Sequence, residues 1–175
     1  MPSPVGHALG GIAAGLLIAS PAAAARARWI QVGALAAIGM APDLDLLIGR
    51  HRLESHSIGT AVLAGAIAAA FGWPLARSRP LIFLAAFGAW FSHAVLDYLG
   101  ADTSTPLGVM IWWPFSTAYH YAGLSILLPI SRRWWLPGFM AHSLLAALRE
   151  VLVLGPIAAL CLWWRWSRRG DSSEL

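Results

Sequence analysis

Residues 80–99 have the sequence PLIFLAAFGAWFSHAVLDYL, and this stretch decides the fold class. A helix that spans a bilayer needs about 20 apolar residues, which is the length of this stretch. Its ionisable side chains, His93 and Asp97, both lie near its C-terminal end. They are four residues apart, so a helix places both on one face. Because ionisable residues at membrane depth usually pair with one another or mark a functional site, we predict a membrane helix that ends in a polar site.

The rest of the chain has a similar composition. Of its 175 residues, 58% are hydrophobic and 11% are charged, whereas a soluble domain has about 25% charged residues. The basic residues are all arginines, set mostly in pairs between apolar runs, which is typical of charge that flanks membrane segments rather than of a nucleic-acid surface. The single Cys161 excludes a disulfide framework. We therefore predict one integral domain over residues 1–166, in the cell membrane, and a polar C-terminal tail over residues 167–175.

Apolar segments divide this domain. They cover about residues 5–20, 29–42, 58–76, 80–99 and 150–166. The second segment is short for a span unless it continues through PDLDLLIG. No basic residue precedes the first segment, so we expect a retained helix rather than a cleaved signal peptide. We add a helix over residues 137–149 and an interfacial or re-entrant aromatic segment around Pro114, and expect an all-α membrane bundle of about four to six helices.

Histidines and aspartates gather at one end of these helices. If the helices alternate in direction, one membrane face receives His7, Asp43, Asp45, His56, His93 and Asp97. The opposite ends carry Arg26, Arg28, Arg77 and Arg79. Arginines prefer the cytoplasmic side, so we expect the histidines and aspartates on the non-cytoplasmic face. Arg50 and Arg52 break this rule, which suggests that they serve a purpose other than topology.

These residue types are the ones that bind zinc and related divalent ions. Asp43 and Asp45 follow Pro42, where a helix is expected to break, and His51 and His56 flank a short polar turn. Each motif alone has a structural explanation, since a His–Asp pair at helical spacing is more often a hydrogen bond and PDLD is a common turn signal. The convergence of four segments on one face favours a metal site. We therefore predict a site for a divalent metal.

The motifs PDLD, HRLESHS, SHAVLD and PLGVMIWWPFS occur in an order that resembles the membrane-bound metal-dependent hydrolase family. That family is in turn similar to the all-helical zinc phospholipase C and single-strand nuclease superfamily. The resemblance covers residues 1–116 and implies metal ligands at His7, Asp45, His56, His93 and Asp97, with Asp43 and His51 next in line. His142 lacks an acidic residue four positions on, so the resemblance implies one or two ions, zinc or else manganese. We expect His120 and His142 to be structural or interfacial.

Metal-dependent hydrolysis of a phosphoester or related ester is the function we expect. A bound zinc ion lowers the pKa of its water to about 7. Asp43 is then a bridging ligand or the base that orients this water, Arg52 holds a phosphate through its planar guanidinium, and His51 protonates the leaving group. A site at the bilayer edge favours a lipid-like substrate, while the superfamily leaves nucleic acid open. No obligate protein partner is evident.

Two other functions use the same residues. A non-catalytic membrane protein would bind or transport the metal, but transporters place their ionisable residues near the bilayer midplane rather than at helix ends. In a purely structural bundle, the aspartates and histidines would form hydrogen bonds with one another and have no other role. That third interpretation predicts no bound metal.

Overall fold

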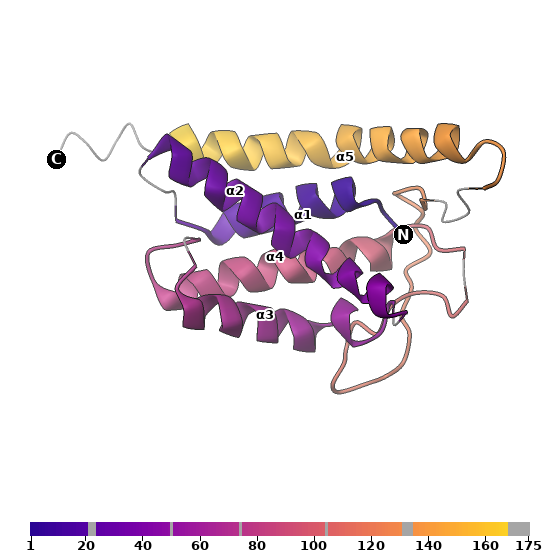
Figure 1. Ribbon diagram of the computed structural model, residues 1–175, viewed down its shortest axis with the longest axis horizontal. Helices are drawn as coiled ribbons and strands as arrows, with labels where there is room; N and C mark the ends of the chain where they lie inside the picture. The colour runs from indigo at the N-terminus through magenta and orange to yellow at the C-terminus, as the bar shows by residue number, and fades with distance from the viewer. Residues whose placement is uncertain (21–23, 50, 74, 104, 131–134, 168–175) are drawn as a thin grey trace.

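A computed structural model describes residues 1–20, 24–49, 51–73, 75–103, 105–130 and 135–167. The elements are α1 (Pro4–Ile18), α2 (Ala25–Met40), the 3₁₀ helices η1 (Ala41–Ile48) and η2 (Glu54–His56), α3 (Ile58–Phe71), α4 (Arg79–Leu99) and α5 (Phe139–Ser167). The described residues contain no strand, only an isolated antiparallel bridge between Val109 and His120. The all-α bundle is therefore confirmed (Figure 1). Arg50 and tail residues 168–175 lie outside the described residues.

Within the part of the chain that the structure describes, three segments are long and apolar enough to cross a membrane. They are Ala25–Ile48, Arg79–Leu99 and Phe139–Ser167, whereas α1 and α3 are shorter apolar helices. The second predicted segment does continue through PDLDLLIG, because η1 extends α2 without a break. The expected helix over residues 137–149 and the apolar run that follows it form one helix, α5, with Pro156 inside it. Membrane helices tolerate an internal proline because neighbouring groups satisfy the freed carbonyl.

The helices lie side by side and alternate in direction (Figure 1). α1 is central and packs against α2, α4 and α5, while α3 packs against α4. The interior between the helices holds many alanines, including Ala61, Ala85 and Ala89, all fully buried. Small side chains allow membrane helices to approach closely. Large apolar side chains instead cover the outside, as expected for a bundle whose solvent is lipid.

α1 and α2 approach closely at Gly11 and Gly39. A Cβ atom on Gly39 would lie 2.5 Å from the carbonyl oxygen of His7 and 2.9 Å from Cα of Gly11. Only glycine fits at this distance, so the two backbones are in direct contact. The contact brings the first turn of α1 beside the end of α2, where η1 begins.

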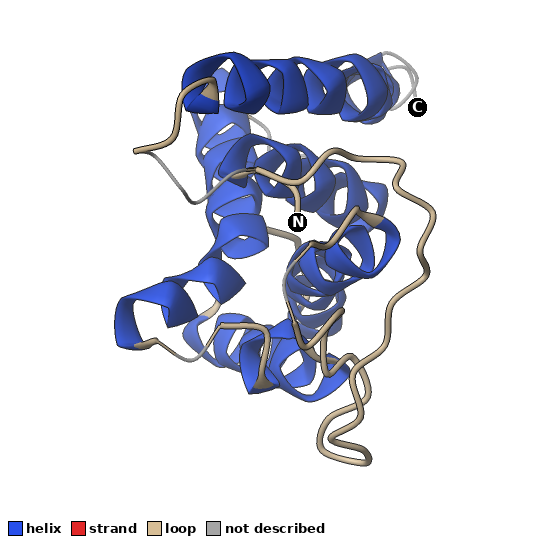
Figure 2. Ribbon diagram, turned by 90° about the vertical axis from the view of Figure 1, so that its right-hand side faces the viewer, coloured by secondary structure: helices blue, strands red, loops and turns tan. Residues whose placement is uncertain are grey.

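The aromatic segment around Pro114 forms turns and a loop rather than a helix. Figure 2, which looks onto the end of the bundle that holds the N-terminus, shows the loop between α4 and α5 at this end. Its carbonyls at Ile111 and Trp113 accept hydrogen bonds from the backbone of Ile58 and Gly59, the first two residues of α3. The loop therefore accepts hydrogen bonds from backbone N–H groups at the start of α3 that have no partner within the helix.

We expect Gly39→Ala to lower the free energy of unfolding by about 1–3 kcal/mol, because the added methyl group forces two backbones apart. Thermal unfolding in detergent measures the change. Gly33→Ala is the matched control, since a Cβ atom at this position on the same helix meets no atom within 4 Å. Equal unfolding midpoints for the two variants would contradict the close contact.

Candidate metal centre

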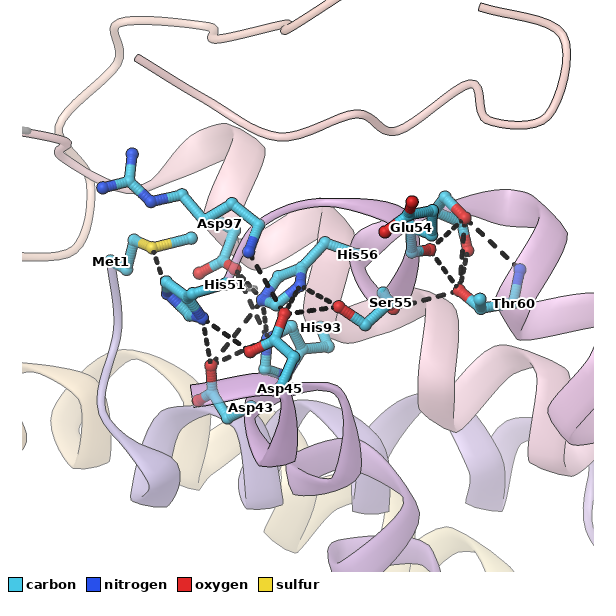
Figure 3. A network of polar contacts seen from close by, with 12 residues as sticks. Met1, Asp43, Asp45, His51, Glu54, Ser55, His56, Thr60, His93 and Asp97 are labelled. Atoms are coloured by element: carbon cyan, nitrogen blue, oxygen red, sulfur yellow. Dashed lines mark hydrogen bonds and ion pairs between the residues drawn. The ribbon is translucent and has the colours of Figure 1, made fainter. Parts of the chain in front are cut away.

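Seven histidine and aspartate side chains converge at the end of the bundle where α1 begins. Figure 3 shows six of them, Asp43, Asp45, His51, His56, His93 and Asp97. The seven come from α1 (His7), η1 (Asp43, Asp45), the following turn (His51), η2 (His56) and α4 (His93, Asp97). All the predicted metal ligands thus lie in one cluster, together with the predicted proton donor His51. Whether the cluster binds a metal remains a prediction.

His93 is oriented by the backbone of α2. Its Nδ1 lies 2.8 Å from the carbonyl oxygen of Gly39, the residue of the close helix contact. Because a carbonyl only accepts hydrogen bonds, Nδ1 carries a hydrogen and a neutral ring presents the lone pair of Nε2 to the cluster. Metal-binding histidines are usually oriented by a hydrogen bond of this kind from the ring nitrogen that does not bind the metal.

The facing atoms have the spacing of a metal-ligand set. Nε2 of His93 lies 3.0 Å from Nε2 of His56, and Oδ2 of Asp97 lies 3.4 and 3.3 Å from these two nitrogens. Oδ1 of Asp43 lies 3.6 Å from each of the same nitrogens. Ligands at about 2.0–2.2 Å from a tetrahedral zinc ion are themselves about 3.3 Å apart. The spacing of these side chains therefore fits a zinc site.

Asp97 lacks the hydrogen bonds that a buried carboxylate needs. Both of its oxygens are buried without a hydrogen-bond partner in the described part of the chain, as is Nδ1 of His7. Its nearest neighbours are imidazole nitrogens, including Nε2 of His7 at 3.4 Å. Burying a carboxylate without hydrogen bonds has a high free-energy cost. A cation bound between these side chains would offset that cost.

Asp45 organises the turn that carries two of the histidines. Its Oδ2 accepts hydrogen bonds from the Ser55 hydroxyl at 2.5 Å and from the Arg52 backbone N–H at 3.2 Å. Its Oδ1 lies 2.8 Å from Nδ1 of His51, and Nδ1 of His56 lies 3.2 Å from Oδ2. Arg52 adopts a left-handed backbone conformation, with φ of 70°, which is costly for a residue other than glycine. These contacts indicate that Asp45 orients His56, rather than serving as a metal ligand itself.

The carboxylates favour positive charge on His56. Burial by itself would lower the pKa of this histidine, but its contacts with Asp43 and Asp45 raise the pKa above the ordinary value. A proton on His56 and a metal cation are alternative ways to balance the same carboxylates.

Asp43 lies between the buried atoms and the surface. Its side chain is 21% exposed, and its Oδ2 lies 3.9 Å from Nε2 of His7. Arg52, by contrast, is buried, and its Nη1 donates to Asp102 at 2.6 Å and to the carbonyl of Pro106 at 2.9 Å. The guanidinium thus ties the turn to the loop after α4. The predicted phosphate contact of Arg52 would have to compete with Asp102, a partner that sequence spacing could not reveal.

His120 and His142 lie outside the cluster. The backbone of His120 pairs with Val109, and the exposed His142 places Nε2 2.8 Å from the carbonyl of Pro129. These contacts fit the structural or interfacial roles expected for both.

Glu150 is a residue that sequence reasoning missed. It lies on α5, is fully buried, and accepts hydrogen bonds from the backbone N–H groups of Ser3 and Gly6 at 2.7 and 3.0 Å and from the Ser3 hydroxyl. Arg165, further along α5, donates to the carbonyls of Leu16 and Leu17 at the other end of α1. α5 therefore places an acid at the positive end of the α1 dipole and an arginine at its negative end. The signal in the sequence was an acidic residue at the start of an apolar run.

We expect Glu150→Ala to destabilise the protein by at least about 2 kcal/mol, because it leaves buried donors of Ser3 and Gly6 without an acceptor. Unfolding in a denaturing detergent measures the loss. Arg149→Ala is the control, since this neighbour is exposed on the same helix. If both variants unfold alike, Glu150 does not hold the start of α1.

No curated protein and no solved structure matches the chain. A family model described as YdjM inner membrane protein matches residues 1–171. Our expectation of membership in the membrane-bound metal-dependent hydrolase family is therefore wrong, and the match lends no support to kinship with the phospholipase C and nuclease superfamily. The ligand order implied by that resemblance carries no further weight, and the candidate centre rests on its geometry. The chain is an integral membrane protein and belongs to the YdjM inner membrane protein family.

Proposed function

We propose that this protein is a membrane-embedded metal-dependent hydrolase that cleaves a phosphoester or related ester bond. The observation that carries the proposal is the Asp97 carboxylate, buried without a hydrogen bond and 3.3–3.4 Å from nitrogens of three histidines. A carboxylate that only satisfied these histidines would be expected to hydrogen-bond to them. A cation between them accounts for both the spacing and the missing hydrogen bonds.

The donor atoms favour one or two divalent ions. The side chains near enough to share an ion fall into two groups, the first with Asp43, Asp45, His51 and His56 and the second with His7, His93 and Asp97. In the first group Asp43 and His56 are the proposed ligands, while Asp45 orients His56 and His51. Asp43 lies within 4 Å of histidines in both groups, so its carboxylate is positioned to bridge them. Imidazole and carboxylate ligands suit zinc, with manganese as the alternative.

A divalent ion held by these residues would lower the pKa of a bound water and would polarise the scissile group. Asp43 is partly exposed beside the ligand atoms, so its carboxylate can orient that water and accept its proton. His51 lines a cavity next to the cluster and is held through Nδ1 by Asp45, which suits a donor of the proton to the leaving group. The neighbouring Arg52 keeps this turn in place through Asp102.

We place this centre on the non-cytoplasmic face. Arg26, Arg28, Arg77, Arg79 and Arg165 lie at or next to the start of α2, the start of α4 and the end of α5. Figure 1 shows these helix ends opposite the N-terminus, whereas Arg52 lies beside the centre. Arginines are retained on the cytoplasmic side of membrane helices. The centre lies at helix ends, which supports a surface-accessible enzyme over a transporter, whose site is expected near the midplane.

Elemental analysis of detergent-purified protein tests the metal. We expect one or two zinc-like ions per chain in the wild type and loss of metal in His93→Ala and Asp97→Ala. His142→Ala is the control, because this exposed histidine lies outside the cluster and its Nε2 contacts the backbone carbonyl of Pro129. Circular dichroism shows whether each variant stays folded.

The reaction is tested with soluble nitrophenyl phosphodiester and carboxyl-ester substrates on the metal-loaded protein. Turnover that disappears in Asp43→Asn while metal is retained supports the role of Asp43. Absence of metal after reconstitution with zinc, manganese and nickel would overturn the proposal. Bound metal without hydrolysis of either substrate would favour the metal-binding alternative.

A further inference from the structure

A cavity of about 1300 Å³ adjoins the candidate centre. One wall is polar and includes Asp43, His51 and Asp102, so it contains two of the groups proposed to act in hydrolysis. The lining also has an apolar part, which includes Leu44, Leu47 and Phe139. Pockets for ordinary small molecules are about 300–1,000 Å³, so this cavity has room for a larger, two-sided ligand.

The apolar wall belongs to two membrane-spanning segments. Leu44 and Leu47 lie on η1, at the end of the span Ala25–Ile48, and Phe139 begins the span Phe139–Ser167. Leu44 and Leu47 are 64% and 83% exposed, so they face the lipid as well as the cavity. The cavity therefore opens toward hydrocarbon along this wall.

The polar wall lies at the level expected for lipid headgroups. α5 has 29 residues, a length of about 43 Å, which exceeds the hydrocarbon core of about 30 Å. Trp135, just before α5, is 63% exposed, and Trp112 in the loop after α4 is 49% exposed. Exposed tryptophans concentrate where hydrocarbon meets the headgroups.

We infer that the substrate is a membrane lipid that enters this cavity sideways from the bilayer. Its hydrocarbon chain lies along Leu44, Leu47 and Phe139, and its ester- or phosphoester-linked headgroup reaches Asp43 and His51. The inference rests on the proposed function and names its substrate class. A lipid matches the polar and the apolar lining residues at once, because it carries a polar headgroup and a hydrocarbon chain in one molecule.

Photolabelling in vesicles tests the inference. The protein is reconstituted in phosphatidylethanolamine and phosphatidylglycerol that contain an ether-linked phosphatidylglycerol with a diazirine on its chain. The ether linkage prevents hydrolysis, so labelling reports binding alone. We expect the label to concentrate on residues 40–47 and 136–142, as mapped by mass spectrometry.

Leu44→Trp narrows the cavity and is expected to lower this labelling roughly tenfold, as overpacking that costs about 1.4 kcal/mol would do. Leu152→Trp is the matched control, because Leu152 is 66% exposed on α5, outside the cavity lining. Label spread evenly over exposed residues of α3, α4 and α5, or labelling equal in both variants, would overturn the inference. In that case, hydrolysis of soluble esters by metal-loaded protein would leave the proposed function standing. Cavity labelling of a protein that binds no metal would instead overturn the proposed function.

Discussion

A buried carboxylate in a membrane bundle is the constraint on which the rest of the structure depends. Moving an ionised Asp97 out of water costs several kcal/mol unless positive charge or hydrogen bonds replace the water. Three histidines from α1, η2 and α4 lie at 3.3–3.4 Å from it, and neither carboxylate oxygen has a hydrogen-bond partner among the described residues. The bundle must therefore hold these three elements at fixed distances, because otherwise nothing offsets the free-energy cost of burying the Asp97 carboxylate.

Two sets of contacts hold α1, η2 and α4 in these positions. The contact between Gly11 and Gly39 lets α1 and α2 touch at the backbone, and the carbonyl of Gly39 then lies 2.8 Å from Nδ1 of His93. α5 completes the arrangement because Glu150 and Arg165 bind the two ends of α1, which carries His7. In a bilayer, where apolar contact between helices gains little over contact with lipid, backbone packing and polar contacts supply most of the specificity.

The bilayer also connects the candidate centre to its surroundings. η1 extends α2 to the end of a span and bears carboxylates toward the cluster and leucines toward lipid. The same short helix therefore contributes both to the candidate metal centre and to the apolar lining of the cavity. This double role accounts for the two carboxylates, Asp43 and Asp45, that this apolar segment carries.

The sequence by itself determined the all-helical membrane class and the end of the bundle at which histidines and aspartates meet. Segment length, alternating direction and the position of each polar residue are local properties, so they could be predicted. The resemblance of short motifs, by contrast, pointed to the wrong family. Only the tertiary structure decided that Glu150 binds the start of α1, that Arg52 pairs with Asp102, and that Asp45 accepts hydrogen bonds from Ser55 and the Arg52 backbone. Glu150 and Ser3 are 147 positions apart, and no periodicity in a sequence records which distant side chain will satisfy a buried donor.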